Sequence, residues 1–566
     1  MAAILATALV GAQWASHVAV ALSRGMTHVD TLWYHGAYAA EFAQDGRLTD
    51  VLDRTDALHA YATHNSELIH ALFLLPFGRD ILSPLLNLGW AALALLAAWC
   101  TGRHRGVAVP SLLGCVLVLG LPIAAGTHPG QASNDVAAAA LLLAAVALLL
   151  EDPLAPVPTA LAAVAAGLAV GTKLTVAAPV GLLSVGIVVL AVRARRPKPA
   201  ALWCVLVAVF GGYWFLRNIA AVRNPLPYFS FHFGPLSLPA PARNPGATVA
   251  SYLTDGHVWR EFFLPGLSSG LGRGWVIVLA LALGGTVFVV IRGRNSLERL
   301  TAAMVLVGAI AYVFTPLTAA GGGLSFVFNL RYLIPVLVVG FALWPVMLDA
   351  ASAFQRQTVC VCLLGLIALD ATAANHERMR AWPWGHLLAG VLFGAGVVGA
   401  VLLLVYLARR VDTPRFVVAA FLVVAAGVAV SWPVQRRYLE HRYIDAGLHT
   451  DSINAYFRDV HHAQVAVIGT VEAYPMFGLD LSNRVTKLVG RSDSGGRDPC
   501  REWRQLLSGK YRYVVLTTFG LVGASRPPQE WFTEDPAATV VARDGESVAY
   551  HLTGALHPPD CSRGRR

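Results

Sequence analysis

The first residues whose types and order suit chemistry lie in a polar segment just after an apolar N-terminal stretch. The sequence HVDTLWYH contains a carboxylate, Asp30, between two histidines, His28 and His35. An ionisable side chain at a membrane boundary is costly unless it is paired or used. The carboxylate of Asp30 is therefore the first place in the chain to look for chemistry.

A second carboxylate, Asp135, follows the turn GTHPGQASN and opens the apolar run 135–150. A negative charge is stabilised at a helix N-terminus. The residues alone therefore favour an ordinary helix cap, with Ser133 or Asn134 as neighbours, and leave a catalytic role as the alternative.

Histidines gather in the segment HAYATHNSELIH, which also holds Asn65 and Glu67. His59, His64 and His70 with a nearby carboxylate have the chemistry of metal ligands. Their spacing matches no HExxH-type pattern, so we interpret the segment as a helix packed along the membrane surface and assign no metal site.

Isolated cations precede or follow several apolar runs. They are Lys173 in GLAVGTKLT, Arg217 and Arg223 in YWFLRNIAAVRNPLPYF, and Arg331 in NLRYLIP. A single cation near a helix end ordinarily extends to the lipid headgroups. If several converged on the loop of Asp30, they would instead bind an anionic phosphate; the sequence leaves both readings open.

The elements that position these residues are predicted to be membrane-spanning helices. The chain is 56% hydrophobic and 13% charged, and its mean hydropathy is +0.58. Apolar runs of about 17 to 22 residues are long enough to cross a bilayer, so we predict a polytopic α-helical membrane protein with about thirteen spans. The first run is interpreted as a retained span because it lacks the basic start and cleavage site of a signal peptide. The predicted spans are 3–23, 80–100, 110–126, 135–150, 156–171, 174–192, 200–216, 274–291, 301–317, 331–348, 358–374, 386–408 and 415–432.

Basic residues in alternate connections set the predicted orientation. The connections around 103–105, 193–198, 292–299, 356 and 409–415 all fall on one side, which the positive-inside rule assigns to the cytoplasm. The first loop, residues 24–79, and the C-terminal region then face the extracytoplasmic side. The loop NHERMRAWPW fits this alternation poorly because it carries two arginines. The net charge of +10 is spread over these connections without a basic stripe on a soluble domain, which argues against nucleic-acid binding.

From residue 433 the composition becomes that of a soluble domain. QVAVIGT and YRYVVLTT are predicted strands, SINAYFRDVHH and CREWRQLLSGK are predicted helices, and ATVVARDGESVAYHL is a predicted hairpin. We therefore divide the chain into a transmembrane domain, 1–432, and a small extracytoplasmic α/β domain, 433–566, with a loose tail. VIGTVEAYP lacks a dinucleotide fingerprint, and His461 and His462 are interpreted as a solvated pair. Cys500 and Cys561 are the two cysteines placed outside, where an oxidising compartment permits a disulfide; the sequence leaves that pairing open.

The motifs, taken in order, resemble those of a known superfamily. The Asp-x-Leu-x-Tyr-His run, NSELIHAL, SND, GLAVGTKLT, WFLRN with RNPLPYF, and NLRYLIP together resemble the GT-C superfamily of membrane glycosyltransferases. Within it, the chain looks most like bacterial relatives of the protein O-mannosyltransferases and of the lipid A aminoarabinose transferase. The resemblance covers roughly residues 1–350.

This resemblance implies a bacterial plasma-membrane enzyme that transfers a sugar from a polyprenyl phosphate donor to an acceptor hydroxyl outside the cytoplasm. It implies Asp30 as the general base, acting in a single inverting displacement, and gives Asp135 a catalytic role as well. It implies that Lys173, Arg217 and Arg331 bind the donor phosphate. Substrate contacts fall on the motif residues Tyr34, His35, His64, Asn65, Glu67 and Asn218.

The implied acceptor is a glycan, lipid or protein, and the sequence identifies neither it nor the sugar. Where family members often carry an acidic pair, Thr31 follows Asp30, which weakens a metal-binding role for that position; a divalent cation stays the alternative to having no cofactor. Two other functions share the polytopic pattern. A transporter or lipid flippase would be expected to show internal repeats, which we do not find, and an oligosaccharide ligase or polymerase would use a related fold.

Overall fold

The computed structural model describes most of the chain. The described residues are 1–49, 57–234, 236–242, 246–317, 326–372, 382–410, 412–469, 472–488, 506, 511–517, 527–554, 556 and 557. The predicted helix CREWRQLLSGK, Cys500, Cys561 and most of NHERMRAWPW lie outside these residues, apart from single positions.

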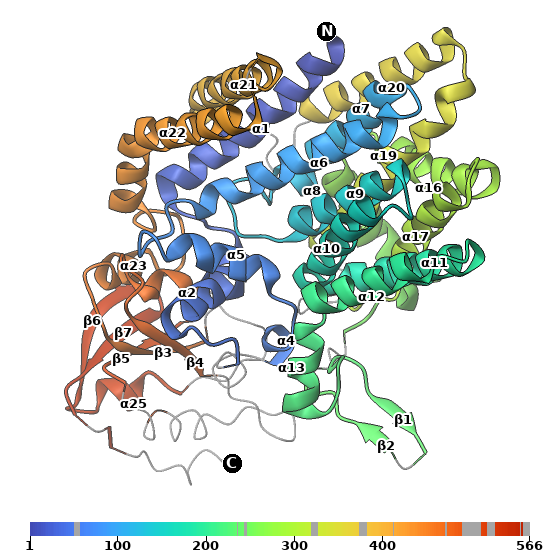
Figure 1. Cartoon of the computed structure of the whole chain (residues 1–566). Coiled ribbons are helices and arrows are strands. Elements are labelled where there is room, and N and C mark those ends of the chain that lie inside the picture. Colours follow the sequence, from blue (N-terminus) through green and yellow to red (C-terminus); the bar gives the residue numbers. More distant parts are fainter. Residues whose placement is uncertain are drawn as a thin grey trace.

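Each predicted span contains a helix, and the helices form the upper part of the molecule in Figure 1. Their bounds are α1 Ala2–Arg24, α6 Leu86–Arg103, α7 Ala108–Gly120, α9 Asp135–Glu151, α10 Pro156–Thr172, α11 Ala177–Arg193, α12 Pro197–Gly211, α16 Trp275–Arg292, α17 Ser296–Val313, α19 Ile334–Leu343, α20 Ala353–Thr372, α21 Leu387–Arg410 and α22 Thr413–His441. The chain is a multi-pass membrane protein.

Fewer helices than the predicted thirteen satisfy a strict length requirement. Among the described residues, seven helices are long and apolar enough to cross a membrane, or up to nine if each bent pair is one span. Helices such as α7, with 13 residues, and α10, with 17, extend only about 20 to 25 Å at about 1.5 Å per residue. These helices are shorter than a hydrocarbon core of about 30 Å. The prediction counted them as full spans because it relied on hydropathy and not on the length of the helix.

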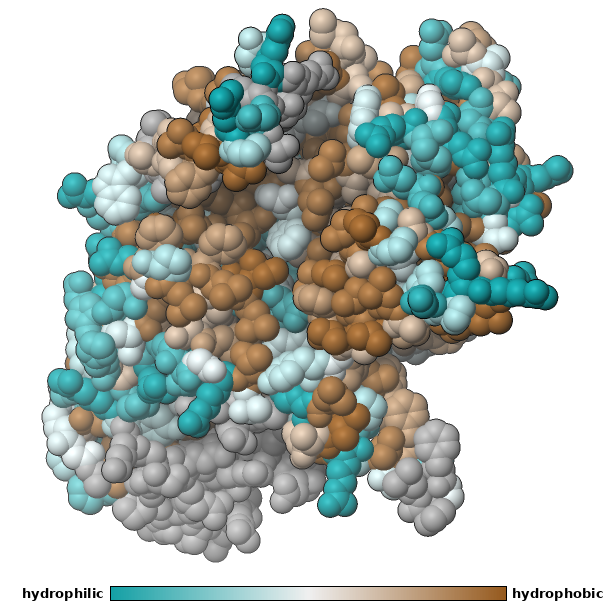
Figure 2. Space-filling view, in the orientation of Figure 1, coloured by the Kyte–Doolittle hydropathy of each residue, from teal (hydrophilic) through white to brown (hydrophobic). Residues whose placement is uncertain are grey.

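The surface agrees with a lipid environment. Figure 2 shows hydrophobic side chains gathered across the middle of this face, with hydrophilic side chains toward its upper right and lower left. Large apolar side chains such as Val192, Phe288 and Ile291 are more than half exposed. A soluble protein rarely exposes so broad an apolar surface, whereas lipid tails cover it.

Ion pairs join the basic connections at the end of the helices away from the first loop. Arg105 pairs with Glu298 at 2.6 Å and with Asp349 at 3.7 Å, and Arg294 pairs with Asp349 at 2.7 Å. Three connections that the charge pattern placed on one side are therefore in mutual contact.

A five-stranded mixed sheet forms the C-terminal part, at the lower left of Figure 1. Its order is β4-β3-β5-β7-β6, with β3 parallel to both β4 and β5 and the other pairs antiparallel. The predicted strands and the hairpin are confirmed, as is a helix, α23 Asp451–Phe457, within SINAYFRDVHH. The prediction missed β4. The strand bounds are β3 Gln464–Ile468, β4 Arg484–Leu488, β5 Tyr513–Leu516, β6 Ala538–Asp544 and β7 Ser547–Leu552.

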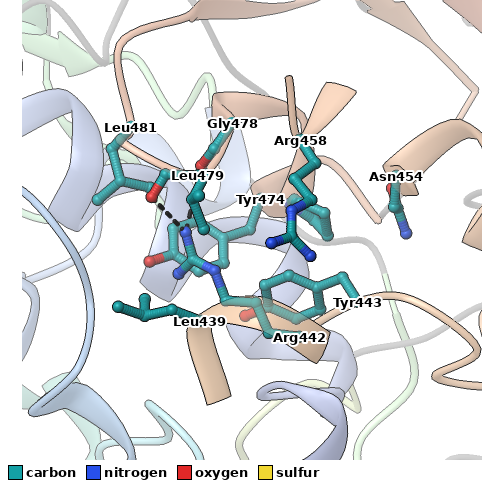
Figure 3. Close-up of a pocket in the computed structure, with 10 residues that line it drawn as sticks. Leu439, Arg442, Tyr443, Asn454, Arg458, Tyr474, Gly478, Leu479 and Leu481 are labelled. Atoms are coloured by element: carbon teal, nitrogen blue, oxygen red, sulfur yellow. Dashed lines mark hydrogen bonds between the residues drawn. The ribbon is translucent and has the colours of Figure 1, made fainter. Parts of the chain in front are cut away.

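A buried polar junction fastens this sheet to the helices. The Asp80 carboxylate forms an ion pair with Arg442 and accepts hydrogen bonds from the hydroxyls of Tyr438, at 3.0 Å, and Tyr474, at 2.9 Å. Arg442 also donates to the carbonyl of Leu479 at 2.8 Å, and Figure 3 shows it beside Tyr474. The adjoining cavity of about 10 Å³ has room for about one water. Because α22 continues through residue 433 to this junction, the domain boundary at 433 stays a prediction.

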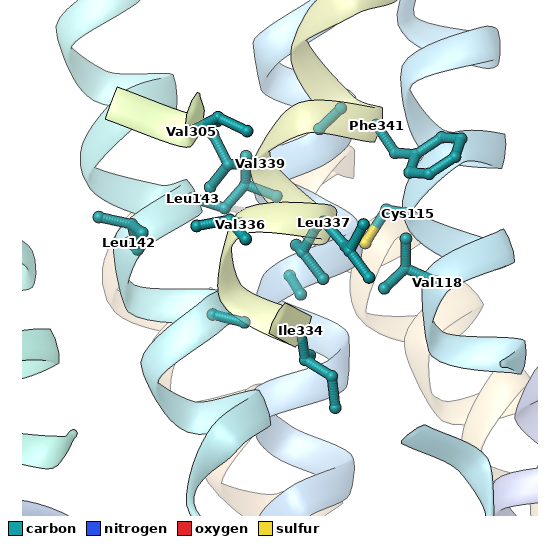
Figure 4. Packing of buried hydrophobic residues seen from close by; sticks show 14 of the residues in the cluster. Cys115, Val118, Leu142, Leu143, Val305, Ile334, Val336, Leu337, Val339 and Phe341 are labelled. Carbon is teal, nitrogen blue, oxygen red and sulfur yellow. The ribbon is translucent and has the colours of Figure 1, made fainter. Parts of the chain in front are cut away.

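The core of the helical part surrounds α19. All ten residues of α19 are buried, as expected of a helix that is apolar all round. Figure 4 shows its side chains among those of α7, α9 and α17, with Leu337 near Cys115 and Val118. Gly114 of α7 permits this approach, because a Cβ there would stand 2.3 Å from the Phe341 carbonyl oxygen. The position of α19 is thus tightly fixed, and with it the residues that immediately precede it.

Candidate active site

Asp30 lies just past the end of α1, at the start of a π-helical turn, η1 Thr31–His35. It is 7% exposed and forms an ion pair with Arg331. Its backbone N–H donates to Nδ1 of His28 at 3.3 Å. Burial alone would raise the pKa of the Asp30 carboxyl, but Arg331 and the nearby histidines outweigh burial and hold that pKa well below its usual range. Asp30 is therefore a buried, charged carboxylate.

Arg331 reaches this carboxylate from the short 3₁₀ turn η7 Leu330–Leu333, directly before α19. Only 9% of the residue is exposed, so it does not extend to lipid headgroups. The rigid helix behind it fixes the cation, and the pairing of Asp30 with Arg331 joins two motifs that the sequence placed far apart.

Asp135 is the first residue of α9, and its side chain does not cap that helix. Asn134 occupies the N-cap position and makes no side-chain cap hydrogen bond. The Asp135 carboxylate instead contacts Lys173 Nζ at 2.5 Å and His128 Nε2 at 3.1 Å. The carboxylate lies in the first turn of α9, where the helix dipole favours it, but the contacts it makes are with Lys173 and His128 and not those of a helix cap.

Lys173 and Arg331 flank the same aromatic ring. Lys173 Nζ lies 4.8 Å from the centroid of the Tyr332 ring, and the Arg331 guanidinium carbon lies 5.4 Å from it. Each of these cations also holds one of the two candidate carboxylates, Asp135 and Asp30. The structure thus brings together four of the sequence-predicted site residues around a tyrosine that the prediction did not single out.

The loop of Asp30 is docked on the turn that precedes α9. The backbone N–H of His28 donates to Gln131 Oε1 at 2.9 Å, and the Thr31 hydroxyl accepts from the backbone N–H of Ala132 at 3.0 Å. Asn87 of α6 holds this turn by donating to the carbonyls of His128, Gln131 and Ser133 at 2.8 to 3.0 Å. These contacts fix the two carboxylates relative to each other.

The histidine segment 59–70 is buried at His64, Glu67 and His70. The helix α5 Asn65–Leu74 places Glu67, 1% exposed, against His35, with His64 Nδ1 3.8 Å away. Burial would raise the Glu67 pKa, but His35 and His64 lower it below its usual range. The expectation of a helix is confirmed. Its placement along the membrane surface stays a prediction, and the side chains of His64, Glu67 and His70 are buried within the protein.

Two more of the predicted substrate contacts, Asn65 and Tyr34, lie in this region. Asn65 accepts a hydrogen bond from the Trp214 indole at 2.8 Å and donates to the Phe210 carbonyl at 3.1 Å. Tyr34 is half-buried, with its ring stacked on His59 at a centroid distance of 4.2 Å. Of the predicted substrate contacts that have rings, Tyr34, His35 and His64, Tyr34 is the one that is partly exposed.

Arg217 lies in α13 Tyr213–Val222 and binds backbone carbonyls. Its guanidinium donates to the carbonyls of Ala60 at 2.7 Å and Ala62 at 3.3 Å, and to Asn218 Oδ1 at 3.1 Å. Asn218 in turn donates to the Tyr61 carbonyl at 3.0 Å. Arg217 is therefore hydrogen-bonded to the first loop at residues 60 and 62.

The prediction missed His128 and Tyr332, although both lie inside motifs that it quoted, GTHPGQASND and NLRYLIP. A histidine seven residues before a carboxylate at a helix start was the available signal for His128. Within the described residues, no group of three or more His, Cys, Asp or Glu side chains has the arrangement of a metal site.

Comparisons with known proteins identify the fold. No family model matches the chain, and no curated protein matches it. Two solved structures of ArnT from Cupriavidus metallidurans do match. The apo structure has a TM-score of 0.51 and 18% identity over 96% of this chain and 97% of ArnT. The structure bound to undecaprenyl phosphate has a TM-score of 0.52 and 16% identity over 98% of this chain and 99% of ArnT. The chain therefore has the fold of ArnT along nearly its whole length, transmembrane helices and C-terminal sheet included.

Proposed function

We propose that this protein is a glycosyltransferase that moves a sugar from a polyprenyl phosphate donor to an acceptor hydroxyl. The observation that carries the proposal is the pairing of two buried carboxylates with two cations around Tyr332, in a fold shared with ArnT, which has been crystallised with undecaprenyl phosphate. Neither part alone specifies the reaction, but together they support the proposal that a phosphate binds beside a candidate base.

Lys173 and Arg331 are the proposed phosphate ligands. A polyprenyl phosphate leaving group carries negative charge that grows as the bond to the sugar breaks, and fixed cations stabilise it. Both cations flank Tyr332 and both are largely buried, where electrostatic interactions are stronger than in water. We assign Arg217 a positioning role, since its donors hold the carbonyls of Ala60 and Ala62.

Asp30 is the proposed general base. While it is paired with Arg331 its pKa is low, and a carboxylate of low pKa accepts protons poorly. A donor phosphate would share the Arg331 guanidinium, and the charge of the Arg331 side chain would then be partly neutralised. The pKa of Asp30 would rise as a result, so the base becomes stronger when the donor is in place. The acceptor oxygen attacks the anomeric carbon, Asp30 takes its proton, and the phosphate leaves with the bonding electrons.

The remaining assignments complete the proposal. Tyr34 is the proposed contact for the sugar or acceptor, because its ring is partly open and lies near Asp30. His35, His64 and Glu67 support the first loop from inside. We propose that the site and the sheet face the extracytoplasmic side of a bacterial plasma membrane, and that the acceptor is a glycan, lipid or protein.

The test is transfer by purified protein in proteoliposomes from undecaprenyl phosphate carrying mannose, arabinose or aminoarabinose. Asp30→Asn keeps the size of the side chain and removes the base. We expect at least a hundredfold loss of transfer, as for removal of a general base, which contributes about 10²- to 10⁴-fold. Undecaprenyl phosphate binding should persist, because the Arg331 side chain remains.

Asp45→Asn is the matched control, because Asp45 ends the helix α2 Gly36–Asp45 in the same loop and pairs with Arg484 of the sheet. It should transfer the sugar at nearly the wild-type rate. Wild-type rates in Asp30→Asn would exclude Asp30 as the base, and absence of transfer from every donor in the wild-type protein, with no binding of undecaprenyl phosphate, would refute the proposed function.

A further inference from the structure

His128 is a fully buried histidine to which the proposed reaction assigns no role. It lies in the turn between α8 Pro122–Ala125 and α9, with 0% of the residue exposed. One nitrogen of its ring contacts Ala124 and Thr127, and the other contacts the Asp135 carboxylate. A buried polar ring of this kind is expected to have all its hydrogen bonds satisfied, and its partners determine where its protons are.

The Nδ1 side of the ring meets acceptors. Nδ1 lies 3.2 Å from the Ala124 carbonyl oxygen and 2.9 Å from the Thr127 hydroxyl. The single hydroxyl proton of Thr127 is donated to the carbonyl of Ile123, so toward the ring its oxygen accepts. Because both neighbours of Nδ1 accept, the proton must be on Nδ1.

The Nε2 side of the ring meets a carboxylate. Nε2 lies 3.1 Å from Asp135 Oδ2, while Lys173 Nζ lies 2.5 Å from Asp135 Oδ1. With one proton already on Nδ1, the contact at Nε2 is a hydrogen bond only if a second proton lies between the ring and the carboxylate. The ammonium of Lys173 on the other oxygen favours the carboxylate anion, and this arrangement leaves the second proton on the ring.

We propose that His128 is a positioning residue for Asp135 and, through it, for Lys173. Nε2–H of His128 donates to one carboxylate oxygen, so the other oxygen is directed at the Lys173 ammonium beside Tyr332. Asp135 is then an anchor for the phosphate-binding cation rather than a second base. This inference rests on the proposed function in one respect only: the ligand that Lys173 is held to receive is the donor phosphate.

Three variants distinguish the hydrogen bond donated by His128 from the packing of its ring. His128→Gln keeps an N–H donor near the position of Nε2, while His128→Leu keeps much of the volume and removes the donor. Thr127→Val removes one of the two Nδ1 acceptors and leaves the Ala124 carbonyl. His70→Leu is the control, because His70 is an equally buried histidine, 3% exposed, on α5 and outside the contacts of Asp135.

The probe is undecaprenyl phosphate, titrated into purified protein in detergent and followed by tryptophan fluorescence, with thermal unfolding measured in parallel. We expect His128→Leu to bind about tenfold to a hundredfold more weakly, the range for loss of one charge-assisted hydrogen bond. His128→Gln should recover most of that affinity, Thr127→Val should lie between, and His70→Leu should match the wild type. In transfer assays the loss should appear mainly in the donor KM.

Two results overturn the inference. Equal affinity in His128→Leu and wild type would show that the contact does not position Lys173, and equal weakening in His128→Leu and His128→Gln would show that ring packing, not donation, matters. A wild-type protein that does not bind undecaprenyl phosphate would refute the proposed function itself, an outcome that the wild-type titration separates from the other two.

Discussion

Replacing Arg442 by methionine tests whether the buried junction holds the C-terminal sheet to the helices. The Asp80 side chain is 0% exposed and that of Arg442 is 4% exposed. The substitution therefore leaves a carboxylate uncompensated in the interior and also frees the carbonyl of Leu479, which accepts from Arg442 at 2.8 Å. Breaking a buried ion pair from one side costs about 3 to 5 kcal/mol. Because the hydroxyls of Tyr438 and Tyr474 still donate to Asp80, we expect the lower end, about 3 kcal/mol.

The assay is unfolding of the purified protein in mixed micelles by increasing SDS, followed by tryptophan fluorescence. The double variant Asp80→Asn with Arg442→Met is the informative comparison, because its amide oxygen still accepts from the tyrosines and no charge is buried. We expect it to be more stable than Arg442→Met alone by about 1 to 2 kcal/mol. A single variant within about 1 kcal/mol of wild type, or a double variant no better than the single, would refute the reasoning.

Two further changes probe the support of Asp30. Burial lowers the pKa of His28 from 6.5 to about 4, so the folded protein resists its protonation while the unfolded chain does not. The stability that neutral His28 contributes is complete above pH 6.5 and is lost as the pH falls toward 4. His28→Asn, whose amide oxygen replaces Nδ1 as acceptor, should weaken the decline of the unfolding midpoint between these pH values, and an unchanged decline would contradict the assignment. Gly130 has φ +73°, and a Cβ there would stand 2.5 Å from Cβ of Ala21 in α1. Gly130→Ala should therefore lower the free energy of unfolding by more than about 1 kcal/mol and reduce transfer, as measured by the same unfolding and transfer assays. Gly46→Ala is the control, because Gly46 has open space around it, and it should retain activity. Equal activity in the two variants would exclude close packing at Gly130.

The amino-acid pattern was sufficient for the helices and for the residues that carry charge at the site. Asp30, Asp135, Lys173 and Arg331 were each identified from type and position, and the structure brings all four around Tyr332. Their pairing was not predictable, because which cation meets which carboxylate depends on how α19 packs among distant helices.

Other differences have similarly physical causes. A helix with His64 and Glu67 on one face has the same periodicity whether that face meets headgroups or the protein interior, so the sequence did not reveal their burial. The strand β4 was missed because Arg484 and Lys487 interrupt its apolar pattern. Both residues contact the first loop, and contacts between segments so far apart in the chain cannot be predicted from the local sequence pattern.

These contacts bear on how the site forms during synthesis. Arg484 pairs with Asp45, Lys487 donates to the carbonyl of Trp33, and Tyr474 packs against Gly36 so closely that a Cβ there would lie 2.8 Å from its ring. The first loop leaves the ribosome well before the strand that packs on it is made, because the contacting residues Asp45 and Arg484 are 439 residues apart. The loop that carries Asp30 therefore lacks these contacts until β4 has folded. We expect a nascent chain halted before β4 to form its helices but not a complete site.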